Sequence, residues 1–206
     1  MKVSLFVGSP RARSNSRSMA VFLQERLEER GATVAIADPV MGRASSVEFD
    51  ASAVEAIREA DAVVILAPVY LDLPPYVALQ WLHELWSRRE QLEGSAPSIY
   101  AVSHSGYFEP VHKRVSIEAL HHFARRMNWP WRGALAFGGT SPIDGRPLEE
   151  AGPFSRRVRP ALAQLSELIV ADRPVPESLI RAARRRPIPL PRRLIVWIMN
   201  AMLRRR

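Results

Sequence analysis

The chain alternates short apolar runs with longer segments whose apolar residues recur at helical spacing. The mostly apolar runs predict five strands, at residues 3–7, 33–37, 62–67, 97–103 and 133–137. The intervening segments predict helices at residues 16–30, 51–59, 76–92, 112–127 and 154–171. Residues 62–67 contain no polar side chain, which is typical of a strand buried on both faces. This order predicts an α/β fold with a doubly wound, five-stranded parallel sheet and helices on both faces.

A sheet of this kind binds ligands at the carboxyl ends of its strands, near the point where the strand order reverses. The loops after the first, third and fourth predicted strands are therefore the ones in which to seek chemistry.

The first of these loops, residues 8–16, leads from a strand to the start of a helix. Backbone N–H groups converge at a helix N-terminus and the helix dipole favours negative charge there. The loop has no Walker lysine motif and no Gly-x-Gly-x-x-Gly, so it is neither a triphosphate cradle nor a dinucleotide fingerprint. A phosphomonoester suits it, and the alternative is an ordinary capped helix whose serines satisfy its own backbone. The side chains that would add donors or charge are Ser9, Arg11, Arg13, Ser14, Asn15 and Ser16.

The loop after the third strand is stiff and apolar. Three prolines lie within residues 68–76, and Val69, Tyr70 and Leu71 place apolar surface at the end of the sheet. A rigid aromatic rim suits a flat ring system, although Tyr70 could instead simply cover the sheet end. Asp72 is interpreted as a turn former or a cap rather than as an acid catalyst.

The loop after the fourth strand combines polar donors with a glycine. Gly106 permits close backbone approach, His104 and Ser105 offer hydrogen-bonding groups, and Tyr107 adds a ring. Backbone donors here would hold the carbonyl edge of a pyrimidine-like ring. The alternative for His104 is a lone polar residue that caps a strand.

Several kinds of chemistry are excluded by the residues present. The chain has no cysteine, which excludes disulfides, thiolate nucleophiles and cysteine-ligated clusters. The histidines lack metal-binding spacing, so no metal site is expected, and no Gly-x-Ser-x-Gly elbow occurs. No secretory leader is apparent at the N-terminus, so a cytoplasmic protein is expected.

The net charge of +8 comes from the C-terminal segment. Residues 1–172 hold 19 basic and 20 acidic side chains, whereas residues 173–206 hold ten arginines and one glutamate. We therefore expect a domain over residues 1–172 with no nucleic-acid surface, followed by a Pro/Arg-rich linker and a short apolar-basic helix.

The end of this extension, residues 192–206, has two interpretations. Residues 194–203 contain one polar side chain, Asn200, and are bracketed by arginines. They are too few to span a bilayer, which takes about 20 residues. They would either pack on the domain or a partner subunit, or attach peripherally to an anionic membrane.

Three motifs in this order resemble the NADPH-dependent FMN reductase branch of the flavodoxin-like fold. They are Gly8-Ser9-Pro10-Arg11 with Ser14-Asn15-Ser16, Pro68-Val69-Tyr70 with Leu73-Pro74, and Ser103-His104-Ser105-Gly106-Tyr107. The resemblance covers about residues 1–172, with Trp129-x-Trp131-x-Gly133 and Gly138-Gly139 as further points of similarity. Many relatives carry glycines where Leu71 and Asp72 stand, so the approach to the ring is expected to be narrower here.

The resemblance implies noncovalently bound FMN. The phosphate would lie on Ser9, Arg11, Ser14, Asn15 and Ser16. The ring would lie against Pro68, Val69, Tyr70 and Leu71 on one side and Ser105, Gly106 and Tyr107 on the other, with His104 as a further donor.

The same resemblance implies an oxidoreductase that passes electrons from NADPH or NADH through FMN to a quinone, a free flavin or another small acceptor. The flavin carries the chemistry, so no catalytic side chain is expected. A homodimer is also implied, with Trp81, Trp86 and Tyr107 near its interface. The alternatives are an electron-carrier flavodoxin, for which an acidic body is expected, and a flavin-free binding module that acts through the basic tail.

Overall fold

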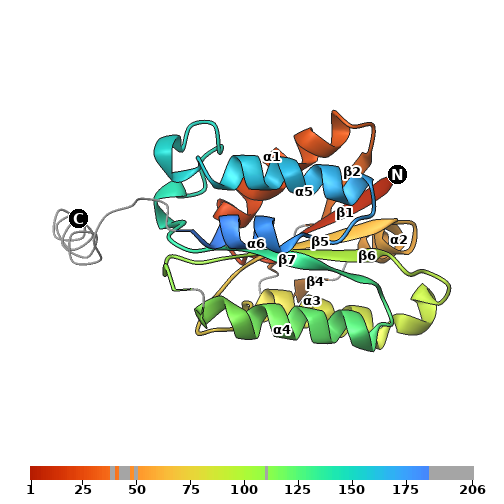
Figure 1. The fold of residues 1–206 in the computed structure, drawn as a ribbon. Helices are drawn as coiled ribbons and strands as arrows, with labels where there is room; N and C mark the ends of the chain where they lie inside the picture. Colours follow the sequence, from red (N-terminus) through yellow and green to blue (C-terminus); the bar gives the residue numbers. More distant parts are fainter. Residues whose placement is uncertain (38–39, 42–46, 49–50, 110, 186–206) are drawn as a thin grey trace.

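The computed structural model describes residues 1–37, 40–41, 47–48, 51–109 and 111–185, and its centre is a five-stranded parallel sheet. The strand order is β2-β1-β5-β6-β7, so the order reverses between β1 and β5 (Figure 1). This is the flavodoxin-like, doubly wound arrangement that the sequence predicts. The strands are β1 (Lys2–Val7), β2 (Thr33–Ala37), β5 (Ala62–Pro68), β6 (Ser98–His104) and β7 (Trp131–Phe137).

Helices cover both faces of the sheet (Figure 1). One face carries α1 (Asn15–Glu28), α5 (Val158–Val170) and α6 (Glu177–Arg184). The other carries α2 (Ala51–Arg58), α3 (Tyr76–Ser87) and α4 (Val111–Arg126). Within the described residues, single turns of 3-10 helix also occur at Arg89–Leu92, Ser141–Ile143 and Gly152–Phe154.

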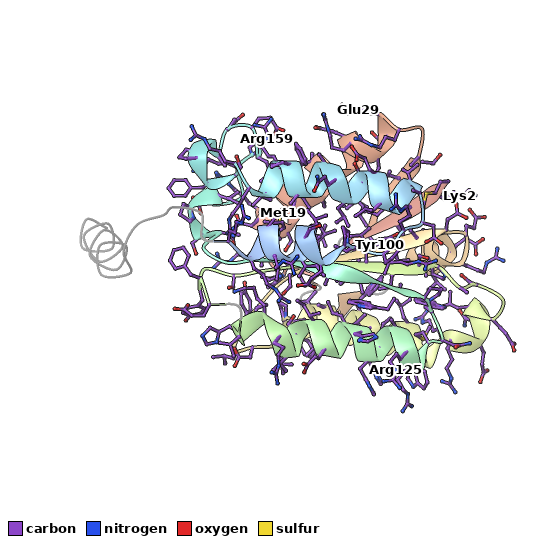
Figure 2. The ribbon with its side chains drawn as sticks, viewed as in Figure 1. Lys2, Met19, Glu29, Tyr100, Arg125 and Arg159 are labelled. Atoms are coloured by element: carbon purple, nitrogen blue, oxygen red, sulfur yellow. The ribbon has the colours of Figure 1, made fainter. Side chains whose placement is uncertain are left out.

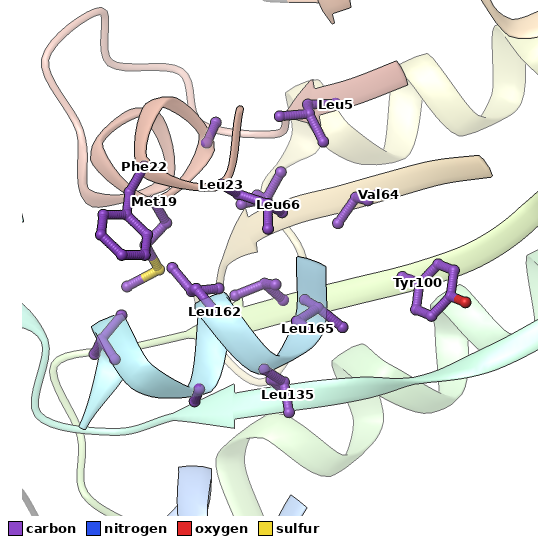
Figure 3. Close-up of a cluster of buried hydrophobic side chains, with 14 of the residues drawn as sticks. Leu5, Met19, Phe22, Leu23, Val64, Leu66, Tyr100, Leu135, Leu162 and Leu165 are labelled. Atoms are coloured by element: carbon purple, nitrogen blue, oxygen red, sulfur yellow. The ribbon is translucent and has the colours of Figure 1, made fainter. Parts of the chain in front are cut away.

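Successive side chains of a strand point to opposite faces of the sheet, and both faces are covered by helices, so the strands are mostly apolar. Val64 and Leu66 face the α1 and α5 layer, whereas Val63 and Ile65 face the opposite layer, and all four are fully buried or nearly so. Figure 3 shows the first of these layers, in which leucines of α1 and α5 meet Val64 and Leu66. Because both faces are covered, the strands lack the polar alternation of a half-exposed sheet.

Two elements differ from the sequence-based expectation. The last long helix begins at Val158 rather than 154, which places Pro160 in its first turn, where the missing N–H costs nothing. A short antiparallel pair, β3 (Val40–Met41) and β4 (Val47–Glu48), was not predicted. Side chains are distributed as expected for a sheet covered by helices, with Met19 and Tyr100 buried and Arg125 on an outer helix surface (Figure 2).

Packing continues past the domain boundary expected at residue 172. The N–H of Val175 donates to the carbonyl of Arg132 at 2.7 Å, and its side chain lies over Gly133, where an added Cβ would come within 3.0 Å. Leu179 and Ala183 of α6 are buried against the same layer as α5. The expected boundary therefore falls within a packed segment that reaches at least Arg185. The expected apolar-basic helix at 192–206 lies outside the described residues.

The tryptophans expected near a subunit interface have intramolecular partners. Trp81 is buried and its ring stacks on Phe6 with centroids 3.8 Å apart, so it belongs to the core rather than to an interface. The ring of Trp86 contacts the guanidinium groups of Arg89 and Arg126, each 4.7 Å from its centroid. Tyr107 remains well exposed at the carboxyl edge of the sheet.

Candidate functional site

The loop after β1 forms the expected strand–turn–helix unit. Gly8 extends the strand pairing by donating to the carbonyl of Leu66, and Ala67 and Ala78 pack so close that an added Cβ would lie within 3.1 Å of each. Ser14 is the N-cap of α1, since its hydroxyl accepts the N–H of Arg17 at 3.2 Å. The hydroxyl of Ser9 accepts the N–H of Arg11 at 3.3 Å and so tightens the turn.

Asn15 and Ser16 connect this loop to the end of β6 and to the loop after β7. The Asn15 amide donates to the carbonyl of Thr140 at 2.7 Å and accepts the N–H of Gly145 at 2.8 Å. The Ser16 hydroxyl lies 2.7 Å from Nε2 of His104. Four of the five side chains expected at a phosphate therefore already have protein partners, and the guanidinium group of Arg11 is exposed to solvent.

The backbone of the same loop keeps donors available. Among the contacts described for residues 1–37, none occupies the N–H groups of Asn15 and Ser16, the first two of α1. Both N–H groups point out of the helix N-terminus, where the dipole favours an anion. Arg13 is also exposed, and the first turn of α1 contains no acidic side chain. The donor set suits a phosphate group.

The loop after β5 supplies an apolar shelf. Its Val69 N–H donates to the carbonyl of His104 at 2.8 Å, which joins it to the end of β6, directly before the loop that follows that strand. Tyr70 and Leu73 exchange two backbone hydrogen bonds around Leu71 and Asp72, whose φ angles are +50° and +70°. Two non-glycine residues thus hold the left-handed conformation that glycine adopts without strain.

Two of the exposed positions on this shelf carry an aromatic and an aliphatic side chain. Leu71 is 98% exposed and Tyr70 is 47% exposed, whereas Pro68 and Val69 are buried below them. The Asp72 carboxylate accepts a hydrogen bond from Nδ1 of His112 at 2.8 Å, and His112 lies against Tyr107 with ring centroids 5.3 Å apart. The shelf and the Tyr107 loop therefore form one continuous rim.

The loop after β6, residues 105–109, lies close against the loop after β7. An added Cβ at Gly106 would lie 2.5 Å from the Ser141 hydroxyl, and one at Gly138 would lie 2.5 Å from the carbonyl of Tyr107. Both glycines are thus required by close approach. Ser105 is buried and its hydroxyl donates to the Tyr107 carbonyl at 3.0 Å.

His104 lies behind this loop rather than on its surface. It is buried, with Ser16 at one ring nitrogen and the Thr140 hydroxyl 3.4 Å from the other. Burial, and secondarily the charge of Lys113, lowers the pKa of His104 to about 4, so the ring is neutral near pH 7. A neutral imidazole at this position links α1 to the loop after β7.

Three residues of this region were not predicted from the sequence: Lys113, Thr140 and Arg157. Lys113 is 1% exposed and its pKa is lowered to about 8, mainly by burial. The sequence did hold a signal, because Lys113, Ser116, Leu120 and Ala124 share the buried face of α4. Arg157 donates to the carbonyls of Gly138 and Ala183, and burial lowers its pKa to about 10.

The described residues offer no metal cluster and no membrane-spanning helix, and their open cavities lie elsewhere on the molecule. Open cavities of about 760 and 650 Å³ lie between α1 and α5 and at the amino edge of the sheet, away from these loops. Across the part of the chain that the structure describes, no group of three or more His, Asp and Glu side chains could hold a metal ion. Within the same part, no helix is long and apolar enough to cross a membrane.

Comparison with known proteins agrees with this geometry. The family model for NADPH-dependent FMN reductases matches residues 1–75, which include the loops after β1 and β5. No curated protein matches the chain.

Solved structures share the fold at low sequence identity. A provisionally named quinone reductase from Klebsiella pneumoniae has a TM-score of 0.64 at 16% identity, covering 85% of this chain and 87% of its own. General stress protein 14 from Treponema denticola, solved in complex with FMN, has a TM-score of 0.57 at 14% identity, covering 81% of this chain and 99% of its own. A flavodoxin, WrbA-like protein from Agrobacterium tumefaciens has a TM-score of 0.54 at 13% identity, covering 80% of this chain and 96% of its own. The resemblance to the NADPH-dependent FMN reductase family is thus confirmed over residues 1–75, and the fold of the described domain is flavodoxin-like.

Proposed function

We propose that this protein binds FMN at the carboxyl edge of its sheet and acts as an oxidoreductase. NADPH or NADH is the electron donor, and a quinone, a free flavin or another small molecule is the acceptor. The observation that carries the proposal is the pairing of an anion-binding helix N-terminus at α1 with an apolar shelf at Tyr70 and Leu71. These two features match the two chemically distinct ends of FMN, its phosphate and its flat ring.

The residues present fit the group at both ends. The free N–H groups of Asn15 and Ser16, with Arg11 and Arg13, supply donors and positive charge for a phosphate. The 105–109 loop supplies backbone donors on the other side of the shelf. The match of residues 1–75 to an FMN reductase family and the FMN complex of a similarly folded protein support the same assignment.

When bound, FMN supplies the hydride and electron transfer, and the protein supplies the setting. The α1 N-terminus would anchor the phosphate. The shelf at Val69, Tyr70 and Leu71 would shield one face of the ring from water and leave an approach for donor and acceptor. His104 and Ser16 would keep the floor of the site neutral and fixed, because their hydrogen bond is buried.

Two spectroscopic experiments test this function. Purified protein is first titrated with FMN and followed by flavin fluorescence, and saturable binding is expected. The complex is then mixed anaerobically with NADPH or NADH, and the flavin absorbance band is expected to bleach. Bleaching by dithionite but by neither nicotinamide would exclude the reductase and favour an electron carrier. A panel of quinones and flavins would then identify the acceptor.

An electron carrier that docks on redox proteins is the second candidate. Its support is the flavodoxin-like fold itself. The nearly neutral body of residues 1–172 counts against it, since an acidic docking surface is expected of such carriers. The nicotinamide experiment separates the two functions.

We further propose a cytoplasmic homodimer whose C-terminal segment, residues 192–206, contacts either a partner or an anionic membrane. The exposed rim around Tyr107 offers apolar surface for a second subunit. Analytical ultracentrifugation measures the oligomeric state. Co-sedimentation with anionic and neutral vesicles, using the full chain and a chain ending at Arg185, tests the membrane contact, and equal, negligible sedimentation of both would reject it.

A further inference from the structure

Lys113 is the buried charged group that the proposed function leaves unexplained. Its ammonium group donates three hydrogen bonds, to the Ser105 hydroxyl at 3.0 Å and to the carbonyls of Tyr107 and Glu109 at 3.1 and 2.8 Å. These use all three donors of a lysine ammonium. All three acceptors belong to the 105–109 loop, so a single side chain on α4 holds the whole loop.

The hydrogen bonds from Lys113 orient the carbonyl groups of the 105–109 loop, and this determines where the backbone N–H groups of the loop point. In a trans peptide the C=O and the following N–H point to opposite sides. The Tyr107 carbonyl faces Lys113, so the N–H of Phe108 points away from the buried ammonium. The Ser105 carbonyl accepts the N–H and the hydroxyl of Thr140, both at 3.0 Å, so the N–H of Gly106 points away from Thr140.

Both N–H groups remain available to a ligand. Among the contacts described for residues 51–109 and 111–185, neither the Gly106 nor the Phe108 N–H has an acceptor. They lie two residues apart on the loop that borders the apolar shelf, to which Val69 connects it. Such a pair of preorganised backbone donors suits the oxygen and nitrogen acceptors along one edge of a flat heterocycle.

The lysine is the one charged side chain among the buried residues that the structure describes in α4. The others on the same face, Ser116, Leu120 and Ala124, carry no charge. The sequence holds only two lysines, Lys2 and Lys113, against 27 arginines. Burial disfavours the charged ammonium and lowers its pKa to about 8, with the Arg157 charge acting in the same direction and the Glu109 carboxylate opposing it.

We propose that Lys113 is a positioning residue that holds the 105–109 loop so that the N–H groups of Gly106 and Phe108 face the edge of the flavin ring. The proposal rests on the FMN site proposed above. Its ammonium group also places positive charge behind that edge, which favours the more negative, reduced form of the flavin and raises its reduction potential.

The test compares Lys113→Met, Lys113→Arg and the control Lys2→Met. Methionine keeps much of the side-chain volume without donors or charge. Lys2 lies at the amino edge of the sheet (Figure 2), so its replacement removes the same charge far from the loop. Its ammonium group there donates a hydrogen bond to the Glu59 carboxylate. Circular dichroism melts first establish that each variant is folded.

Amide hydrogen exchange of the flavin-free protein is the first measurement, because it needs no cofactor. The hydrogen-bonded amides that fix this loop are those of Ser105, Gly139 and Thr140, which donate to Phe137, Tyr107 and Ser105. These amides are expected to exchange at least about tenfold faster in Lys113→Met, corresponding to about 1.4 kcal/mol, and at the original rate in Lys2→Met. Lys113→Arg keeps the charge and several donors, so its exchange rate is expected to lie between those of Lys113→Met and the unaltered chain. Unchanged exchange in Lys113→Met would overturn the loop-holding role.

FMN affinity and reduction potential are the second measurement. Lys113→Met is expected to bind FMN about tenfold more weakly and to lower the potential of the bound flavin, with partial rescue by Lys113→Arg. If exchange is faster in Lys113→Met but its FMN affinity and flavin reduction potential are unchanged, the proposal that Lys113 orients these N–H groups toward the flavin ring would be overturned. If the unaltered chain binds no FMN, the proposed function and the role toward the ring both fall, whereas the exchange data still decide whether Lys113 holds the loop.

Discussion

Replacing Asn15 tests whether the N-terminus of α1 binds a phosphate or is an ordinary helix cap that serves only the protein's own backbone. The Asn15 amide makes two hydrogen bonds that tie α1 to the loop after β7, to the Thr140 carbonyl and from the Gly145 N–H. Each is worth about 1 kcal/mol net, so Asn15→Ala is expected to lower the free energy of unfolding by about 2 kcal/mol. For a chain of this size that corresponds to a melting temperature about 4–8 °C lower.

Asn15→Asp changes the charge while keeping the shape. The new carboxylate still accepts the Gly145 N–H and gains about 0.3–1 kcal/mol from the helix N-terminus, but it loses the donor to Thr140. Its second carboxylate oxygen faces the Thr140 carbonyl in place of the donating amide, so Asn15→Asp is not expected to be more stable than Asn15→Ala. FMN affinity should be lower in Asn15→Asp than in Asn15→Ala, because a carboxylate beside a bound phosphate costs about 1–4 kcal/mol for each pair of like charges at 4 Å.

The assays are urea unfolding of the flavin-free protein and fluorescence titration with FMN at two salt concentrations. Asn15→Asp is expected to bind FMN at least about tenfold more weakly than Asn15→Ala, with a smaller difference at high salt. Gln164→Glu, which adds the same charge at an exposed position on α5, serves as the control and is expected to bind normally. Equal FMN affinity in Asn15→Asp and Asn15→Ala would refute the placement of the phosphate at the α1 N-terminus.

Two further predictions concern stability. Unfolded His104 gains a proton as the pH falls below about 6.5, whereas the folded residue stays neutral to about pH 4, so the unaltered chain should lose about 3 kcal/mol more stability than His104→Asn between pH 7 and pH 4. Denaturant unfolding at several pH values measures this, and parallel pH profiles would contradict it. Leu71 is almost fully exposed with a φ of +50°, so Leu71→Gly should raise stability by about 0.5–1 kcal/mol. Leu71→Ala keeps the Cβ and should leave stability unchanged, and a gain in both variants would show that backbone strain is not the cause.

The fold could be predicted because its strands and helices follow local rules. The fully apolar run at 62–67 became the central strand β5, buried on both faces, and Ser14 became the N-cap of α1. Periodicity and capping act over a few residues, and parallel strands need helical crossovers, so these patterns leave few alternative topologies. The end of the domain was less well predicted, because the packing of Val175 on Gly133 depends on a contact between distant residues.

The sequence also located the three loops of the candidate site, since motifs at strand ends are read along the chain. Their internal contacts were decided by tertiary structure. Ser16 faces His104, 88 residues away, and Asn15 faces Thr140 and Gly145. Hydroxyl and amide groups suit a ligand or a protein partner equally well, and only the folded chain determines which partner lies within reach.

Lys113 shows the same division most clearly. The helical pattern of α4 puts it on the buried face, and the sequence determines that much. That its ammonium group meets Ser105, Tyr107 and Glu109, rather than solvent, depends on how the loop after β6 lies against α4. That placement also needs the close approach of the loop to Gly138, which leaves no room for a Cβ. Side-chain chemistry is thus encoded locally, whereas the partners that shift a pKa or orient a backbone donor come from elements that meet only when the sheet is assembled.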